Sequence, residues 1–248
     1  MKKPFIQAAF LTLLLVVSGL ACAYARQAQT QELQAIKLAE PIKKGGLPAM
    51  EAFSVRASAT GWSDKELNAQ DLSDLLWAAN GVNRPDIKKR TAASAMNAQD
   101  VDIYVFTKTG VFIYDAASHA LNPVVSGDHR EEIRMTPGGA RPGGPAGAPP
   151  AGAPGRGPGT QGAQPPINLI LVSDNSRFGA GTPELKYEWG AIDTGLVSQN
   201  IQLFCAAKGF ATRPRASIHK DALRKLLKLK DTQYPFLEHP VGYPAATK

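Results

Sequence analysis

Hydrophobic residues repeat at helical spacing in three stretches of the chain. In the first, the leucines and the alanine between residues 72 and 79 fall on one helical face. Asn68 is placed to cap the start of this helix, with Asp71 three residues on, and Gly81 to end it. A long helix is predicted at 186–208, ended by Gly209, and a shorter one at 220–229.

Other stretches have the pattern of β-strands. Residues 101–106 alternate and are rich in β-branched and aromatic side chains, and 111–114 return after a turn at 108–110, which predicts a hairpin. Residues 168–173 form a continuous apolar run, typical of a buried strand, whereas the prolines and glycine of 239–244 indicate a turn. Helices that alternate with hairpin-connected strands predict the α+β class.

The segment 137–166 interrupts this pattern. It consists mostly of glycine and proline without a strict triplet repeat, and it contains no apolar side chain larger than alanine or proline. A segment with so little to bury cannot offset its ordering entropy, so we expect a disordered insert within one domain. The domain is expected at 51–248, after an extended, partly basic lead-in at 26–50.

The N-terminus has the pattern of an export signal. Lys2 and Lys3 precede an apolar run that is shorter than the roughly 20 residues of a membrane span, and Ala23-Tyr24-Ala25 fits a signal peptidase site. We therefore expect a signal peptide at 1–25 and a periplasmic or secreted protein with no stable membrane span after cleavage. Lipidation at Cys22 and retention as a single-span anchor are the alternatives.

Charge, cysteine and histidine content limit the kinds of binding site and cross-link that the chain can form. Loss of Lys2 and Lys3 lowers the net charge from +7 to +5, and the dispersed basic residues do not form the stripe that nucleic-acid binding requires. Cys205 is the single cysteine left after cleavage, so no intramolecular disulfide can form, and it is expected to be a buried apolar residue. The four histidines lack metal-ligand spacing, so we nominate no metal site, and no phosphate loop or nucleophile elbow occurs.

Two short segments place polar residues where a ligand could be bound. Arg56 and Ser58 stand two residues apart ahead of the helix at 72–79, and residues 94–99, Ser-Ala-Met-Asn-Ala-Gln, run directly into the strand at 101–106. Composition alone favours a solvated loop over a ligand site for these segments.

An ordered set of motifs resembles the nitroreductase family, and more narrowly its exported, SagB-type branch. The opening Arg56-x-Ser58 with Trp62 resembles the family's first motif. The segments 72–79, 83–86, 89–91, 93–99, 189–193, 198–200, 209–212 and 242–244 resemble later ones. The resemblance covers residues 54–130 and 167–244 and leaves the Gly/Pro-rich insert outside it.

This resemblance implies an α+β fold with a mostly antiparallel sheet flanked by helices, in an entwined homodimer with flavin mononucleotide (FMN) at the interface. The residues that it places at the flavin are Arg56, Ala57, Ser58, Ser94, Asn97, Gln99, Arg213, Arg215, Ala216 and Ser217. Arg56 and Ser58 would bind the phosphate or ribityl chain. Ser94 and Asn97 would approach the isoalloxazine or ribityl edge of the flavin, from the same or the partner subunit. The backbone of 214–217 would face the reactive flavin nitrogen. The reaction implied is ping-pong two-electron transfer from a small-molecule donor to an acceptor such as a nitroaromatic or a quinone.

Three departures from the family pattern keep other functions open. Thr60 replaces a basic residue, Ala216-Ser217 replaces a Glu-Gly pair, and the basic phosphate ligand near the C-terminus is absent unless Arg213 or Lys248 substitutes. The alternatives are a non-enzymatic flavin-binding or degenerate-site envelope protein, and an oxidase of peptides. Outside the cytoplasm nicotinamide cofactors are scarce, so either another reductant serves or an envelope metabolite is oxidised.

Overall fold

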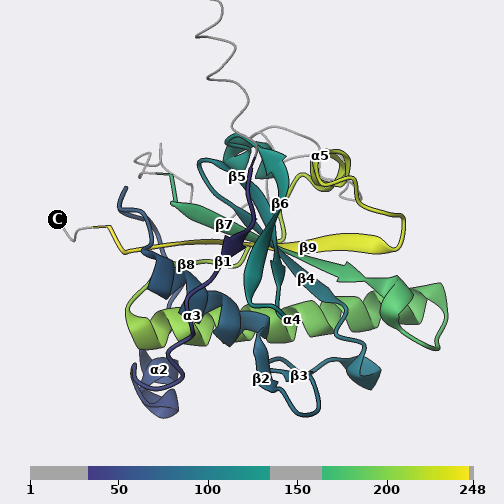
Figure 1. Cartoon of the computed structure of the whole chain (residues 1–248), viewed down its shortest axis with the longest axis horizontal. Coiled ribbons are helices and arrows are strands. Elements are labelled where there is room, and N and C mark those ends of the chain that lie inside the picture. Colours follow the sequence, from purple (N-terminus) through teal and green to yellow (C-terminus); the bar gives the residue numbers. More distant parts are fainter. Residues whose placement is uncertain (1–32, 135–163, 246–248) are drawn as a thin grey trace, which may run out of the picture. The chain divides into compact units, whose positions relative to one another are not determined.

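The computed structural model describes residues 33–134 and 164–245 of the 248 (Figure 1). The predicted signal peptide at 1–25 lies outside the described residues, and so does the predicted insert except for its last three positions. Pro165 and Pro166 are buried, and their carbonyls accept hydrogen bonds from Nη1 of Arg130 at 3.0 and 3.1 Å. The folded body therefore includes the end of the Gly/Pro-rich segment, because two proline rings supply apolar surface to bury.

A seven-stranded sheet, antiparallel throughout, forms the centre of the fold (Figure 1). Its strands, in spatial order, are β1 (Ile36–Lys37), β6 (Ala120–Ser126), β5 (Gly110–Asp115), β4 (Val101–Phe106), β7 (Ile167–Asp174), β9 (Gln233–Gly242) and β8 (Ala211–Thr212). A separate hairpin consists of β2 (Val82–Arg84) and β3 (Lys89–Arg90). The sheet begins before Met50, because β1 in the expected lead-in pairs with β6.

The predicted hairpin is confirmed by the pairing of β4 with β5, in which Val105 lies opposite Phe112. The predicted apolar strand is confirmed as β7, which is buried along its whole length between β4 and β9. The turn predicted at 239–244 is wrong for residues 239–242, which end β9. Prolines 235 and 240 are tolerated there because β8 pairs with only two residues of β9, so most of β9 is an edge strand.

Within residues 33–134 and 164–245, four helices and three short 3-10 turns accompany the sheet. The helices are α2 (Ala49–Val55), α3 (Ala69–Asn80), α4 (Pro183–Lys208) and α5 (Lys220–Leu226), and the turns are η1 (Ala95–Asn97), η2 (Arg130–Ile133) and η3 (Asn175–Arg177). The caps are as predicted for α3, where the Asn68 side chain accepts from the Asp71 N–H, and for α4, which ends at a left-handed Gly209. α4 begins three residues earlier than predicted, at Pro183 after the Thr182 cap, and α5 ends at Leu226 rather than 229.

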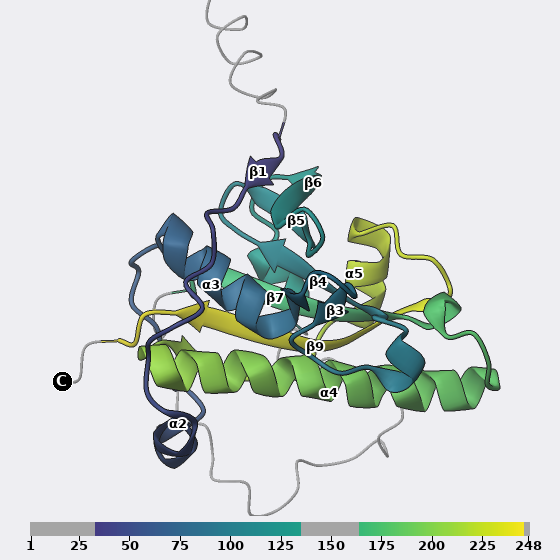
Figure 2. The same cartoon turned by 60° about the horizontal axis from the view of Figure 1, so that its bottom comes forward.

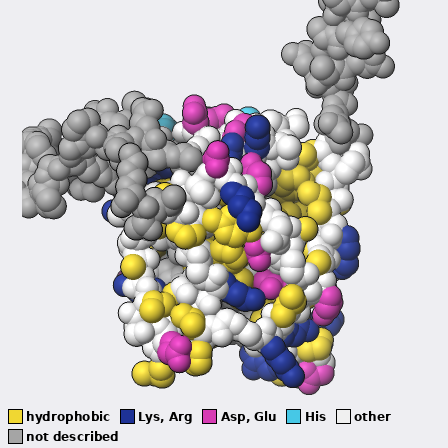
Figure 3. All heavy atoms as spheres, turned by 90° about the vertical axis from the view of Figure 1, so that its left-hand side faces the viewer, with side chains coloured by type: hydrophobic (Ala, Val, Ile, Leu, Met, Phe, Trp, Pro, Cys, Tyr) yellow, Lys and Arg dark blue, Asp and Glu magenta, His cyan; other side chains and the backbone are white. Residues whose placement is uncertain are grey.

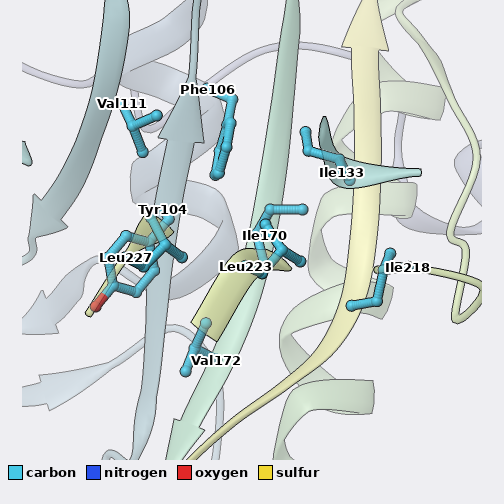
Figure 4. Packing of buried hydrophobic residues seen from close by; sticks show 9 residues of the cluster. All are labelled: Tyr104, Phe106, Val111, Ile133, Ile170, Val172, Ile218, Leu223 and Leu227. Carbon is cyan, nitrogen blue, oxygen red and sulfur yellow. The ribbon is translucent and has the colours of Figure 1, made fainter. Parts of the chain in front are cut away.

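The helices cover both faces of the sheet. α3 and α4 pack against each other, and α4 also packs on β4, β7, β8 and β9 (Figure 2). α5 lies on the opposite face, where Leu223 and Leu227 cover side chains of β4, β5 and β7 (Figure 4). That cluster consists of Tyr104, Phe106, Val111, Ile133, Ile170, Val172, Ile218, Leu223 and Leu227. Alternate residues of the same strands therefore build two cores, one under α5 and one under α4.

Candidate functional site

The segment that follows α2 lies against the edge strand β8. Arg56 is the C-terminal cap of α2, so the first motif begins at the end of a helix that the sequence did not predict. The Ala59 N–H donates to the Thr212 carbonyl at 2.9 Å, and Trp62 Nε1 donates to the Ala211 carbonyl at 3.0 Å. The fold thereby brings residues 56–62 beside 211–213, which are far away in the sequence.

Two arginines at this edge are free of carboxylate partners among the described residues. The Arg56 side chain is exposed, and its one hydrogen bond is a long 3.5 Å contact to Oε1 of Gln202 on α4. Arg213 is half-buried, and Ala57 and Ser58 are exposed. Figure 3 views the molecule from the side of Figure 1 on which α2 and β8 lie, and dark-blue Lys and Arg side chains are interspersed with yellow hydrophobic ones there. Unpaired guanidinium groups beside a hydroxyl suit a phosphate.

Arg215, in contrast, is held by a buried carboxylate. Its backbone pairs in both directions with Glu238 on β9, its Nη1 lies 3.5 Å from Oε2 of Glu238, and its guanidinium stacks 5.5 Å from the Trp62 ring centroid. Arg134 lies 3.8 Å from the other carboxylate oxygen. Burial raises the pKa of Glu238 and lowers that of Arg215, and each charge opposes the shift of the other.

Sequence reasoning missed Glu238 because the end of its strand was assigned to a turn. The carboxylate fixes the segment 213–217 to the sheet. Beyond this anchor Ala216 and Ser217 are exposed, and within the described residues neither N–H donates to a backbone carbonyl. These two N–H groups are free to donate to a ligand.

The second predicted segment, 94–99, forms a tight loop over the N-terminal half of α4. The Ser94 hydroxyl accepts from the Gln99 N–H at 2.9 Å, and the Ser94 carbonyl accepts from the Asn97 N–H at 3.0 Å. Met96, Asn97 and Gln99 have positive φ angles, a conformation that costs free energy and persists only under surrounding constraints.

Two contacts hold this loop in place. The Ala95 N–H donates to Oδ2 of Asp193 on α4 at 2.8 Å, and Nη1 of Arg177 donates to the Gln99 carbonyl at 2.9 Å. Asp193 is itself buried beside Asp100, whose Oδ2 accepts from the Ser173 hydroxyl at 2.5 Å. Burial and the neighbouring Asp193 carboxyl raise the pKa of Asp100 to about 7, which the Ser173 hydrogen bond opposes. Sequence reasoning missed this acidic pair, because only the packing of α4 on β7 brings the two carboxyls together.

The two groups of candidate residues meet α4 at different places. Arg56 reaches the helix at Gln202 and the 94–99 loop reaches it at Asp193. Nine residues, from 193 to 202, correspond to about 14 Å along the helix axis. One chain thus gathers Arg56, Ser58, Arg213, Arg215, Ala216 and Ser217, and holds Ser94, Asn97 and Gln99 apart from them.

The structure also bears on a thiol nucleophile, a metal site and a membrane span. Cys205 is buried on α4, and burial raises the pKa of its thiol, so it packs as an apolar residue and cannot serve as a nucleophile. No group of three or more potential metal ligands occurs within residues 33–134 and 164–245. None of the helices in those ranges is both long and apolar enough to span a bilayer.

The chain matches the family model described as the nitroreductase family over residues 55–243. Among solved structures it resembles a protein assigned as a nitroreductase from Ralstonia eutropha JMP134, with 26% identity, a TM-score of 0.72, and coverage of 88% of this chain and 93% of that one. It also resembles a nitroreductase family protein from Streptococcus pneumoniae TIGR4 (15%, TM-score 0.53, 80% and 92%). A third similar structure is that of the E. coli microcin synthetase McbBCD complex (18%, TM-score 0.61, 90% and 82%). The last two similarities show the fold alone. No curated protein sequence matches the chain.

Proposed function

The chain belongs to the nitroreductase family, a family of flavin-dependent oxidoreductases, and on that basis we propose that it binds FMN and transfers electrons in the cell envelope. The observation that carries the proposal is that the segments carrying Arg56 and Arg213 lie side by side at one edge of the sheet, joined by the hydrogen bonds of Ala59 and Trp62 to β8. Neither arginine pairs with a carboxylate among the described residues, and the exposed backbone of Ala216 and Ser217 lies on the same segment as Arg213.

The residues present fit the phosphate of such a cofactor. Arg215 pairs through Nη1 with the buried Glu238, whereas Arg56 and Arg213 pair with no carboxylate in the described part of the chain and are free to bind an anion. Guanidinium groups bind phosphate with two parallel hydrogen bonds, and the Ser58 hydroxyl can add a third. Arg213 would then supply the charge that relatives place nearer the C-terminus.

When bound, FMN supplies two-electron chemistry, so the chain need provide no acidic or nucleophilic side chain. The chain's own task is to position groups. Glu238 holds Arg215 and with it the segment 213–217, so the N–H groups of Ala216 and Ser217 stay fixed while they donate to a flavin acceptor atom. Ala216 and Ser217 bring no carboxylate to this position, unlike the Glu-Gly pair of relatives.

A homodimer would complete the site. The 94–99 loop meets α4 about 14 Å from the arginine edge, so we propose that the loop reaches the cofactor bound by the partner's arginines. Apolar side chains exposed on this side of the molecule support such an interface: Ile192 and Leu196 on α4 are 61% and 42% exposed, and Met50 and Phe53 on α2 are 77% and 53% exposed.

A charged substitution on the exposed face of α4 tests whether this face forms the dimer interface. Ile192→Lys is expected to convert a dimer into monomers and to release FMN, because a lysine in the interface would be desolvated without a partner. Size-exclusion chromatography with light scattering and the flavin absorbance of each peak measure both effects. Ile36→Lys, at an exposed position on the edge strand β1, is the matched control and should leave mass and colour unchanged. A variant that stays dimeric would place the interface elsewhere.

We propose that the electron donor and acceptor are small molecules of the envelope, because the N-terminal sequence has the pattern of a signal peptide. Nitroaromatics or quinones are the acceptors proposed by family, and nicotinamide cofactors are scarce in that compartment. The donor is then another reductant, or an envelope metabolite is itself oxidised.

The test is to express the full chain, purify the exported protein and analyse what it carries. We expect an intact mass that begins at Arg26, a yellow preparation and release of FMN on denaturation. Release of another flavin would refute FMN, and a mass that includes residues 1–25 would refute cleavage. A colourless protein that takes up no added FMN would instead support the degenerate-site alternative.

A further inference from the structure

A cavity open to solvent lies beside the 94–99 loop, and the sheet strands that line it, β4, β5 and β6, are separated by β7 and β9 from β8 at the arginine edge. Its volume is about 410 Å³, and residues of the hairpin strand β3, the start of β4, the end of β5, β6 and the turn η3 line it. That volume falls within the range of small-molecule sites. Arg90 and Gln99 line it, and both also line a much smaller cavity beneath the loop, of about 10 Å³.

Arg90 is the unusual residue of this cavity. Its Nε is buried and has no hydrogen-bond partner within residues 33–134 and 164–245, and its side chain forms no ion pair with any of them. Burial lowers the pKa of this guanidinium, and the carboxylates of Asp102 and Asp115 oppose the shift without pairing with it. A half-buried cation without a partner is costly, which a bound anion would relieve.

The two nearby carboxylates are already engaged elsewhere. Asp102 accepts from Nη2 of Arg177 at 2.6 Å. Asp115 accepts from the Ser118 hydroxyl at 2.7 Å and from the Ala117 N–H at 2.9 Å, which closes the turn after β5. Their charges nevertheless face the same cavity, so the lining carries two arginines and two aspartates and its net charge is zero. One guanidinium is thus available, in surroundings that do not favour a dianion.

The remaining lining sets the character of the ligand. The side chains of Ile113 and Tyr114 supply apolar surface, and the amides of Gln99 and Asn122 supply hydrogen-bonding groups. The phenol of Tyr114 is engaged with Nδ1 of His119 at 2.9 Å, so this side chain offers its ring rather than its hydroxyl. A planar apolar body with one negative charge fits this combination.

We propose that the Arg90 cavity binds a small monocarboxylate with an apolar or aromatic body, whose carboxylate pairs with the Arg90 guanidinium. The site is separate from the proposed flavin phosphate site, because the sheet strands that line it, β4, β5 and β6, are separated by β7 and β9 from β8, where the arginines lie. The ligand contacts Gln99 and Ala98 of that loop, and through them the segment that we assign to the flavin of the partner subunit.

The test is direct binding to the purified full protein, which needs no turnover and so does not depend on the proposed function. Benzoate is the probe, with benzamide as a neutral molecule of the same shape and inorganic phosphate as a dianion. We expect benzoate to bind by calorimetry and to raise the melting temperature, and both other probes to bind at least tenfold more weakly. Equal binding of benzamide or phosphate would overturn the assignment to a monocarboxylate, and no binding of benzoate would overturn the site.

Substitutions test whether benzoate binds in the Arg90 cavity. Arg90→Gln should weaken benzoate binding at least tenfold, whereas Lys108→Gln, which removes one charge from the exposed turn between β4 and β5, should leave it unchanged. If Arg90→Gln does not fold, Asn122→Trp provides an independent test. Asn122 is exposed on β6 and lines the cavity, so an indole there would obstruct it while Arg90 is kept. Benzoate affinity unchanged in Asn122→Trp, or in a folded Arg90→Gln, would refute the site.

Discussion

Gly190→Ala is expected to lower the free energy of unfolding by about 3 kcal/mol, at the upper end of the cost of overpacking a core. A Cβ at position 190 would collide with Oγ of Ser173, and it would lie 2.9 Å from Cβ of Ser173 and 3.0 Å from Oδ1 of Asn175. Ser173 cannot move away freely, because it lies on the central strand β7 and its hydroxyl donates to buried Asp100. α4 would have to shift away from the sheet.

Thermal and urea unfolding measure this effect. A loss of about 3 kcal/mol corresponds to a fall in melting temperature of roughly 6–12 °C for a domain of this size. Gly179→Ala is the matched control, since no heavy atom lies within 4 Å of a Cβ there and its φ is not positive. We expect that control to stay within about 0.5 kcal/mol of the parent. If the two variants were equally stable, α4 would not pack on β7 as closely as described.

This position also shows where the sequence reading reached its limit. In the sequence, the predicted helix at 186–208 carries the small residues Ala191, Gly195 and Ser198 along one face, and a face of small residues allows close approach of another helix or a flat ligand. Within one chain, Gly195 faces open space and the Ser198 hydroxyl bonds with Nε2 of buried His239. The glycine that close packing of α4 requires is instead Gly190, and the element packed against it is the strand β7. Helical spacing shows which residues share a face, but not what that face meets.

Some helix ends, in contrast, could be predicted from the sequence. The Asn68 cap and the Gly209 end depend on hydrogen bonds within a few residues, so they can be read directly from the chain. The 239–242 strand was missed because its identity depends on pairing with β7, which is distant in sequence. Glu238 and Asp193 belong to the same class, since each became relevant only through a partner on another element.

The candidate site depends both on sequence motifs and on contacts between segments that are distant in the sequence. Motif resemblance selected Arg56 and Arg213 separately, and it gave no reason why they should be close in space. The hydrogen bonds of Ala59 and Trp62 to β8 provide that reason. The same structure holds the 94–99 loop apart from them along α4, and this separation supports the proposed dimer.

Arg56→Gln is expected to raise the dissociation constant for FMN about 100-fold while leaving the fold intact. A charge-assisted hydrogen bond contributes about 1.5–3 kcal/mol, and a bidentate pair lies at the upper end of that range, which corresponds to about a 100-fold change. The fold should tolerate the change because the side chain is exposed and, in the part of the chain that the structure describes, its only hydrogen bond is the 3.5 Å contact with Gln202. Flavin fluorescence on titration of the apoprotein gives the affinity, and thermal unfolding without flavin checks the fold.

Two comparisons separate a phosphate contact from a general effect of charge. Arg84→Gln removes the same charge from the exposed β2 strand, and it should change FMN affinity little. Riboflavin, which lacks the phosphate, should bind parent and Arg56→Gln with similar affinity. If Arg56→Gln weakened riboflavin as much as FMN, Arg56 would contact the ring or ribityl chain instead. If FMN retention did not change at all, Arg213 and Arg215 would have to hold the phosphate without Arg56, and the family's first motif would have lost that role in this chain.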